Sequence, residues 1–283
     1  IGGGVIGCEF ASIFNAFGTK VTIVEMLPTL IAAEDLHVVR FLQAFLKKKG
    51  IALRLGAKVS SIGRTPRGIE AALEGGGTVE AELALVSVGR RPNTAGIGLE
   101  EAGVKSTGAG IVVDERMRTG AGGIYAAGDV IGGWLLAHVA TREGIVAAEN
   151  ALGGDRTVDY SAVPVTIYTL PEIARVGLTE QEARERGIEV ATGRFPFAAN
   201  GKAKGLREED GFVKWVAAKD GGRLLGLHVI GPQATELLGA GILAVQRGMS
   251  AHQLAEAIFP HPTLTEAVGA AAEAIEGRAI DLL

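Results

Sequence analysis

The sequence has a single cysteine, no excess of charge and no long apolar run, and each of these shortages excludes a class of protein. Cys8 is alone among 283 residues. An internal disulfide and a cysteine-based metal cluster are therefore excluded, so we expect no metal site and a reducing, cytoplasmic setting. A formal net charge of −4 offers no basic surface for nucleic acid. No apolar stretch reaches the roughly 18–20 residues that span a membrane.

The apolar patterns that are present predict an α/β protein in three parts. Residues 1–90 alternate helical and strand patterns and then read as three short strands, which predicts a βαβ unit with an added antiparallel meander. The helices expected there are 5–17 and 35–49, and the strands are 20–25, 51–55, 58–62, 69–73 and 79–88.

The remaining two parts differ in pattern. Residues 91–160 are glycine- and proline-rich loops with a short strand at 123–127 and a helix near 141–152. Residues 161–283 read as antiparallel strands and helices, which predicts a separate α+β domain. The helices expected in that domain are 179–186, 235–247, 251–257 and 265–276.

The glycines at the start of the chain have the spacing G-x-G-x-x-G of a dinucleotide-binding turn. The first glycine permits the tight turn, the second lets backbone approach a pyrophosphate, and the third packs the helix on the sheet. A strand then ends in Glu25. A carboxylate at this place accepts hydrogen bonds from the ribose hydroxyls and repels a 2′-phosphate, so NAD is favoured over NADP. A glycine turn with a solvated glutamate is the purely structural alternative. The expected NAD residues are Gly2, Gly3, Gly4, Val5, Ile6, Gly7, Cys8, Glu9 and Glu25.

Glu9 is the more unusual acid in this segment. It is expected on the first turn of the helix, where a carboxylate gains about 0.3–1 kcal/mol from the helix dipole. That gain alone would explain its presence. The functional alternative is that Glu9 extends from the phosphate-binding end of the helix towards a nicotinamide.

The run from Gly2 to Ala11 resembles the NAD-domain opening of the pyridine nucleotide–disulfide oxidoreductase family, and Val88–Asn93 is similar to its V-G-R-x-P-N motif. The resemblance implies a Rossmann-like NAD-binding domain. It places Glu9 beside the nicotinamide and flavin, the backbone of Val59 at the adenine, and Gly89 near the nicotinamide. It also implies that the position of Cys8 is a variable small one and no redox centre.

Two further motifs resemble the flavin site of this family. Residues 124–129 are similar to its second FAD motif, in which an apolar strand delivers Asp129 to a ribityl hydroxyl; the alternative is that Asp129 caps a helix. Residues 135–138 are similar to its M-L-A-H, with leucine in place of methionine. The resemblance thus implies FAD as a second cofactor, near Asp129, Leu135, Leu136, Ala137 and His138.

In this family the other half of the flavin site and a redox-active Cys-x4-Cys belong to a segment that precedes the NAD domain. The sequence contains neither feature. We therefore expect residues 91–160 to be the C-terminal part of a FAD-binding domain. The whole chain is then a C-terminal portion of a family member.

His261 lies between Pro260 and Pro262, just before a predicted helix. Pro262 makes a cis bond possible. Thr263 and Glu266 have the spacing of a capping box, which explains Glu266 without any function. The run H-P-T-x-x-E-A resembles the catalytic signature of the family. It implies that His261 is the acid/base and Glu266 its orienting partner, at a site shared between two subunits.

Residues 168–180 and 195–203 resemble the dimerisation domain of the family. Within the family, Glu25 disfavours the glutathione reductases, the last residues lack the cysteine pair of mercuric reductases, and soluble transhydrogenases lack H-P-T-x-x-E. The dihydrolipoyl dehydrogenase branch remains. It implies a homodimeric flavoprotein for NAD-dependent oxidation of protein-bound dihydrolipoamide, with lipoyl domains of 2-oxo acid dehydrogenase or glycine cleavage complexes as partners. The alternatives are a non-catalytic NAD-binding and dimerisation fragment, or another disulfide reductase.

Overall fold

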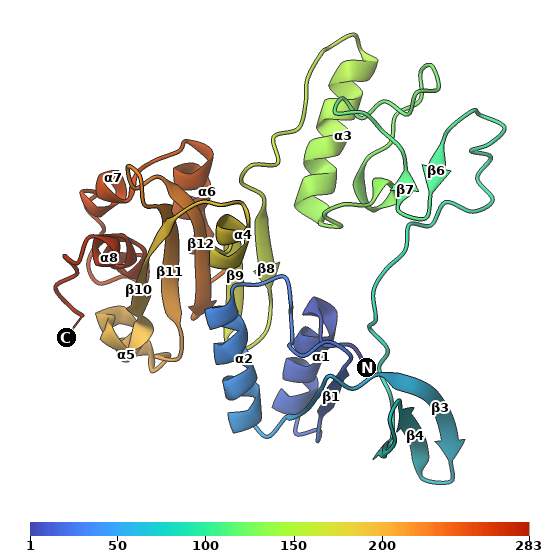
Figure 1. The fold of residues 1–283 in the computed structure, drawn as a ribbon, viewed down its shortest axis with the longest axis horizontal. Helices are drawn as coiled ribbons and strands as arrows, with labels where there is room; N and C mark the ends of the chain where they lie inside the picture. The colour runs from blue at the N-terminus through green and yellow to red at the C-terminus, as the bar shows by residue number, and fades with distance from the viewer. Residues whose placement is uncertain (283) are drawn as a thin grey trace. The chain divides into compact units, whose positions relative to one another are not determined.

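The computed structural model describes residues 1–282, which form two compact units (Figure 1). The larger unit joins Ile1–Val88 to the residues from Ser161 onward, and the smaller unit is Gly89–Tyr160. Both contain helices and strands, which confirms the predicted α/β class. The division into three domains, with boundaries after residues 90 and 160, stays a prediction.

The larger unit begins with the predicted βαβ arrangement. Strands β1 and β2 pair in parallel, with Thr22 opposite Ala52. Helix α2 connects them and buries Val38, Leu42 and Leu46. The meander that follows is antiparallel, in the order β3-β4-β5. The bounds are α1 (Val5–Ala16), β1 (Thr22–Glu25), α2 (Leu36–Lys48), β2 (Ala52–Leu55), β3 (Val59–Thr65), β4 (Gly68–Leu73) and β5 (Thr78–Ala81).

The predicted strand 79–88 is wrong beyond Ala81, where β5 ends. The segment that follows is hydrogen-bonded to the first residue of the chain, Ile1. The Ile1 amino group donates to the Leu85 carbonyl at 2.8 Å, and the Ser87 amide donates to the Ile1 carbonyl at 2.9 Å. A ladder needs a partner along its length, and in the described residues one neighbour does not make this segment a strand.

The rest of the larger unit is built on a five-stranded antiparallel sheet in the order β10-β11-β12-β9-β8. Helices α6 and α8 pack on one face, where Trp215 donates to the Val268 carbonyl at 3.0 Å. Helices α4 and α2 cover the other face, so every residue of β11 is buried. The bounds are β8 (Pro164–Ile167), β9 (Glu172–Gly177), α4 (Glu180–Glu185), β10 (Val190–Pro196), β11 (Phe212–Ala218), β12 (Leu224–Gly231), α6 (Leu238–Gln246), α7 (Ala251–Ala255) and α8 (Glu266–Ile275).

One helix of this sheet domain was not predicted. Helix α5 (Gly201–Leu206) follows a short 3-10 turn, η2 (Phe197–Ala199). The side chain of Asn200 caps it by accepting from the Ala203 amide at 2.9 Å. Its sequence Gly-Lys-Ala-Lys-Gly-Leu contains two glycines, which have low helix propensity and explain why no helix was predicted there.

The smaller unit contains β6 (Ser106–Thr107), β7 (Gly110–Ile111), η1 (Gly128–Ile131) and α3 (Ala137–Ala151). The helix predicted near 141–152 thus begins at Ala137. The strand predicted at 123–127 is wrong, because its pairing in the described residues reduces to one bridge between Tyr125 and Arg118. None of the described helices has the length and apolar character needed to cross a bilayer.

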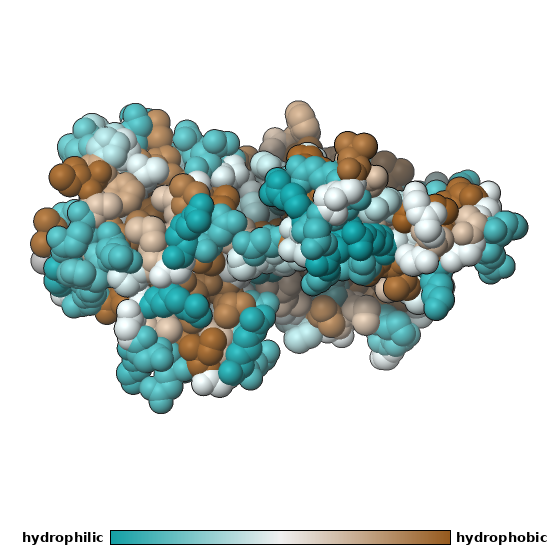
Figure 2. All heavy atoms as spheres, turned by 90° about the horizontal axis from the view of Figure 1, so that it is seen from above, coloured by the Kyte–Doolittle hydropathy of each residue, from teal (hydrophilic) through white to brown (hydrophobic). Residues whose placement is uncertain are grey.

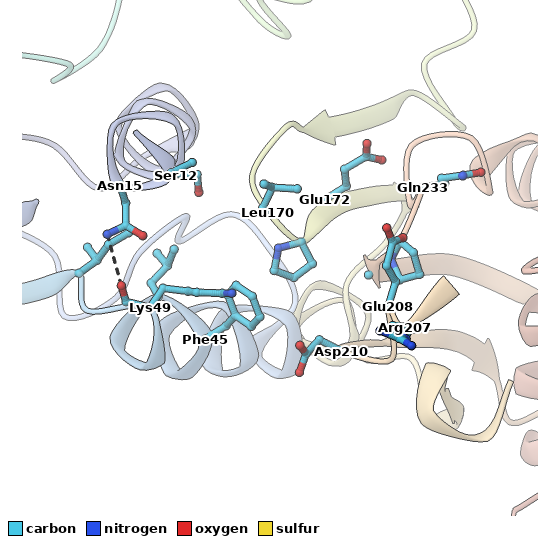
Figure 3. A pocket seen from close by; sticks show the side chains of 16 residues that line it. Ser12, Asn15, Phe45, Lys49, Leu170, Glu172, Arg207, Glu208, Asp210 and Gln233 are labelled. Atoms are coloured by element: carbon cyan, nitrogen blue, oxygen red, sulfur yellow. Dashed lines mark hydrogen bonds between the residues drawn. The ribbon is translucent and has the colours of Figure 1, made fainter. Parts of the chain in front are cut away.

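The surface mixes apolar and polar side chains (Figure 2). The most exposed large apolar residues of the larger unit include Phe17 and Leu83, at 85% and 87%. A cavity of about 500 Å³ lies between the βαβ part and the sheet part of this unit (Figure 3). Its walls include Phe45 and Leu170, and none of the residues predicted to bind a cofactor lines it.

Candidate functional site: a glycine turn and a His–Glu pair

The glycine turn fits the three roles that its spacing predicts. Gly2 has φ +100°, and a Cβ there would overlap the Ser87 carbonyl. A Cβ on Gly7 would overlap the Gly2 carbonyl, so the helix and turn touch through backbone. At Gly4, by contrast, no heavy atom of the described residues lies within 4 Å of a Cβ. The turn is therefore closed at its first and third glycines and open at its second, where a pyrophosphate has room to approach.

The N-terminus of α1 is available to an anion. Gly4 is its N-cap, and within the described chain no side chain caps it and no acid lies in its first turn. Val5 and Ile6 are the first helical residues and are exposed. Their backbone N–H groups and the helix dipole together favour a phosphate at this end.

Glu25 ends β1 as predicted and is 8% exposed. Its Oε2 accepts from the Gly3 amide at 2.6 Å, and its Oε1 accepts from the Leu27 amide at 2.7 Å. A carboxylate has about four lone-pair sites, so two remain for ribose hydroxyls. The contact with Gly3 joins the acid directly to the glycine turn.

Glu9 is placed differently from the prediction. Helix α1 begins at Val5, so Glu9 lies in its second turn and gains little from the dipole, which acts within the first turn. Its Oε1 accepts from the backbone amide of Tyr168 at 2.9 Å. This hydrogen bond ties α1 to the sheet domain, and a nicotinamide contact stays a prediction.

Two other predicted NAD residues have clear structural positions. Cys8 is fully buried. Its burial, together with the negative charges of Glu25 and Glu9 nearby, raises the pKa of its thiol to about 12. Such a thiol stays protonated and unreactive. Val59 begins β3 opposite Leu73, and its contact with an adenine stays a prediction.

The smaller unit brings the predicted flavin residues together through a cation that the prediction left out. Arg90 donates from Nη1 to Asp129 at 2.7 Å and from Nη2 to the Leu135 carbonyl at 2.6 Å. Leu136 is the N-cap of α3 without a side-chain cap in the described chain. Asp129 keeps lone pairs for a hydroxyl, so these residues fit a ribityl chain beside an open helix end.

Three details of the smaller unit complete this site. Ala137 and His138 are the first two residues of α3, and Leu135 has a left-handed backbone with φ +51°. Gly89 has φ +121° and begins the unit. The sequence could have pointed to Arg90, because it follows Gly89 in the motif V-G-R-x-P-N.

In the larger unit His261 and Glu266 form a close pair. The His261 Nδ1 lies 2.8 Å from the Glu266 Oε1, and the His261–Pro262 bond is cis. Burial would raise the pKa of Glu266, but hydrogen bonds from the Thr263 amide and His261 hold it below its usual value. The carboxylate is thus ionised and can accept a hydrogen bond from the Nδ1–H group of His261. When Nδ1 carries the proton donated to this carboxylate, the Nε2 of the exposed ring is the nitrogen with a free lone pair.

The predicted capping box is only half formed. The Glu266 Oε2 accepts from the Thr263 amide at 2.7 Å, as a box requires. The Thr263 hydroxyl instead donates to the Pro260 carbonyl at 2.7 Å, and α8 begins at Glu266 with Thr265 as its N-cap. Glu266 therefore holds both the turn and the imidazole, so capping alone does not account for it.

Residues 1–144 match the pyridine nucleotide-disulphide oxidoreductase family, and residues 163–272 match its dimerisation domain. The chain belongs to the pyridine nucleotide-disulphide oxidoreductase family. FAD and NAD are the cofactors of this family, as predicted from the motifs.

Relatives in this family support the predicted branch. Dihydrolipoyl dehydrogenases from Thermus scotoductus and Bacillus subtilis are 44% and 45% identical over 100% and 99% of this chain. The chain spans 62% and 60% of their length. Among solved structures, LpdA from Mycobacterium tuberculosis matches 96% of this chain and 60% of its own, with a TM-score of 0.89 and 34% identity. The HOCl-induced flavoprotein disulfide reductase RclA from Escherichia coli matches 96% of this chain and 63% of its own, with a TM-score of 0.91 and 30% identity.

Proposed function

We propose that this chain is the NAD-binding and dimerisation portion of a flavoprotein that oxidises protein-bound dihydrolipoamide to lipoamide and reduces NAD. The observation that carries the proposal is the His261–Glu266 pair at 2.8 Å. The open glycine turn with Glu25 at its side supports NAD as the acceptor. The relatives named dihydrolipoyl dehydrogenase support the substrate.

His261 acts in this proposal as the base for the dithiol. Oxidation of the dithiol forms one S–S bond and removes two electrons and two protons. NAD⁺ takes both electrons and one of the protons as a hydride, and the other proton is released. Glu266 fixes the ring with Nδ1 protonated, so Nε2 takes a thiol proton and leaves the thiolate that can attack a disulfide. A flavin, when bound, would carry the electron pair between sulfur and nicotinamide, and Asp129 and the start of α3 would hold it.

The proposal includes a homodimer in which His261 and Glu266 serve the partner subunit. The match of residues 163–272 to a dimerisation domain supports this assembly. The partners proposed are lipoyl domains of 2-oxo acid dehydrogenase or glycine cleavage complexes. We also propose a cytoplasmic setting, which the buried, protonated thiol of Cys8 suits.

The test is His261→Gln in the gene product that contains this chain, with His252→Gln as a control at another exposed histidine. Because proton transfer by a positioned side chain contributes about 10²–10⁴-fold, His261→Gln should lower NAD reduction by dihydrolipoamide by that factor. Electron transfer from NADH to an artificial acceptor, which needs no thiol proton, should not change. The control should keep both rates.

The alternative is a non-catalytic NAD-binding and dimerisation protein. It predicts colourless material that binds NADH and does not oxidise dihydrolipoamide at all. Yellow protein whose dihydrolipoamide rate is the same with and without His261 would contradict the role proposed for the histidine.

A further inference from the structure

Three basic residues form a row across the middle of the dimerisation sheet. Lys214 on β11 is the register partner of His228 on β12, which is in turn the partner of Arg175 on β9. Because side chains alternate along a strand, Lys214 lies on the opposite face from Trp215. All three basic residues are buried, so they need partners from the elements that cover this face.

The ammonium of Lys214 is enclosed by acceptors from α2 and α4. Its Nζ lies 3.0 and 2.8 Å from the two carboxylate oxygens of Asp35, 2.7 Å from the Glu180 Oε2 and 2.9 Å from the His37 Nδ1. Burial opposes ionisation of Asp35, yet its pKa lies below the usual value because His228 and Lys214 are close. Asp35, His37 and Glu180 converge closely enough to ligate a metal ion, and Lys214 contacts all three.

Arg175 binds the residue that precedes Asp35. Its Nε donates to the Glu34 Oε1 at 2.9 Å, and both side chains are at least nine-tenths buried. Two consecutive acids at the start of α2 are thus each bound by a cation of the dimerisation sheet. The βαβ part and the sheet part are joined here by ion pairs as well as by apolar packing.

These two acids end the loop 26–35, whose other contacts reach the glycine turn. The Glu34 amide donates to the Ile31 carbonyl at 2.9 Å, and the Ile31 amide donates to the Gly3 carbonyl at 2.8 Å. The Gly3 amide donates in turn to Glu25. Ile31 is buried with φ +38°, a conformation that persists only where the surroundings fix it. A continuous path of hydrogen bonds therefore connects Arg175 with Glu25.

We propose that Arg175 and Lys214 are positioning residues for the dinucleotide site. They hold loop 26–35 in the conformation that keeps Glu25 against the glycine turn. The inference rests on the proposed NAD site and adds part of the dimerisation domain to it. Because linkage is reciprocal, dinucleotide binding in turn stabilises the contact between this loop and the sheet.

The variant that tests this inference must not leave a buried charge without a counter-charge. Lys214→Met alone leaves the buried Asp35 without its cation, and the loss of one buried partner is strongly destabilising. Glu180 keeps its pair with Arg184 at 2.8 Å. The variant is therefore the neutral combination of Lys214→Met with Asp35→Asn, which removes one charge of each sign and in which asparagine keeps the cap of α2. The matched control is Lys219→Met with Glu189→Gln, which neutralises an ion pair that is exposed.

Affinity for ADP-ribose and for NADH is measured by calorimetry at a temperature where every variant is folded. The neutral combination should weaken both ligands by the same factor, about two- to thirtyfold, because loop 26–35 adjoins the adenosine half. Emission of the buried Trp215 should not shift, since the sheet core keeps its packing. A purely structural role would lower the melting temperature and leave both dissociation constants unchanged.

Dissociation constants within twofold of the unmodified chain would overturn the inference. Equal weakening by the control, Lys219→Met with Glu189→Gln, would do the same, because it would show a general effect of removing an ion pair. If the unmodified chain binds neither ligand, the proposed NAD site itself fails, which is a different result from the first two.

Discussion

His228 lies fully buried between Arg175 and Lys214. Burial is the largest effect that lowers its pKa, to about 4, and the charges of Lys214 and Arg175 lower it further. Asp35 and the hydrogen bond to the Leu178 carbonyl act in the opposite direction. The Nε2 lies 3.0 Å from that carbonyl, and the buried Nδ1 has no partner in the described part of the chain. The ring is therefore neutral in the folded protein near pH 7.

This neutral ring predicts a loss of stability in mild acid. The unfolded chain binds a proton at His228 below about pH 6.5, and the folded chain does so only near pH 4. Stability is thus lost as pH falls between these values, by about 2 kcal/mol from pH 7 to pH 5. Asp35 and Glu180, whose pKa values are lowered, add their losses at still lower pH. Urea unfolding at the two pH values measures the difference.

His228→Gln should remove most of this dependence, because glutamine can donate to the same carbonyl without titrating. His252→Gln, at an exposed ring, is the control and should keep it. An unchanged difference between pH 7 and pH 5 in His228→Gln would show that another group is responsible.

At the scale of elements, the turn before α1 predicts opposite effects for two glycines. Gly7→Ala places a methyl group on the Gly2 carbonyl and should destabilise the chain by about 1–3 kcal/mol, as overpacking does. Gly4→Ala meets no atom of the described chain within 4 Å, so it should cost less than about 1 kcal/mol. It should nevertheless weaken NADH binding, because the methyl group occupies the open side of the turn. Thermal melts and NADH titrations separate the two effects.

The reverse result, with Gly4→Ala unfolding the chain and Gly7→Ala folding normally, would mean that the turn does not have the described geometry. Equal NADH affinity in Gly4→Ala and the unmodified chain would place the pyrophosphate elsewhere.

Local sequence patterns predicted the elements whose partners are near in the chain. The helices α1 and α2 and the strands β1 and β2 are where the periods placed them. The strands predicted at 79–88 and 123–127 were wrong in whole or in part, because a strand exists only with a partner and periodicity does not report one.

At the scale of the whole molecule, resemblance supplied what periodicity could not. His261 and Glu266, five positions apart, were predicted as a pair from their motif, and the structure joins them at 2.8 Å. The ion pairs of Lys214 with Asp35 and of Arg175 with Glu34 join residues 179 and 141 positions apart. No spacing rule reaches that far, so these contacts were visible only in the structure.

We propose that this chain carries a dinucleotide site specific for NAD. Titration of the purified chain with NADH and with NADPH, at the same ionic strength, tests it most directly. In the proposed site Glu25 would accept hydrogen bonds from ribose hydroxyls and repel a 2′-phosphate, so NADH should bind at least about tenfold more tightly, a difference of about 1.4 kcal/mol. Equal affinity for the two, or binding of neither, would contradict the account.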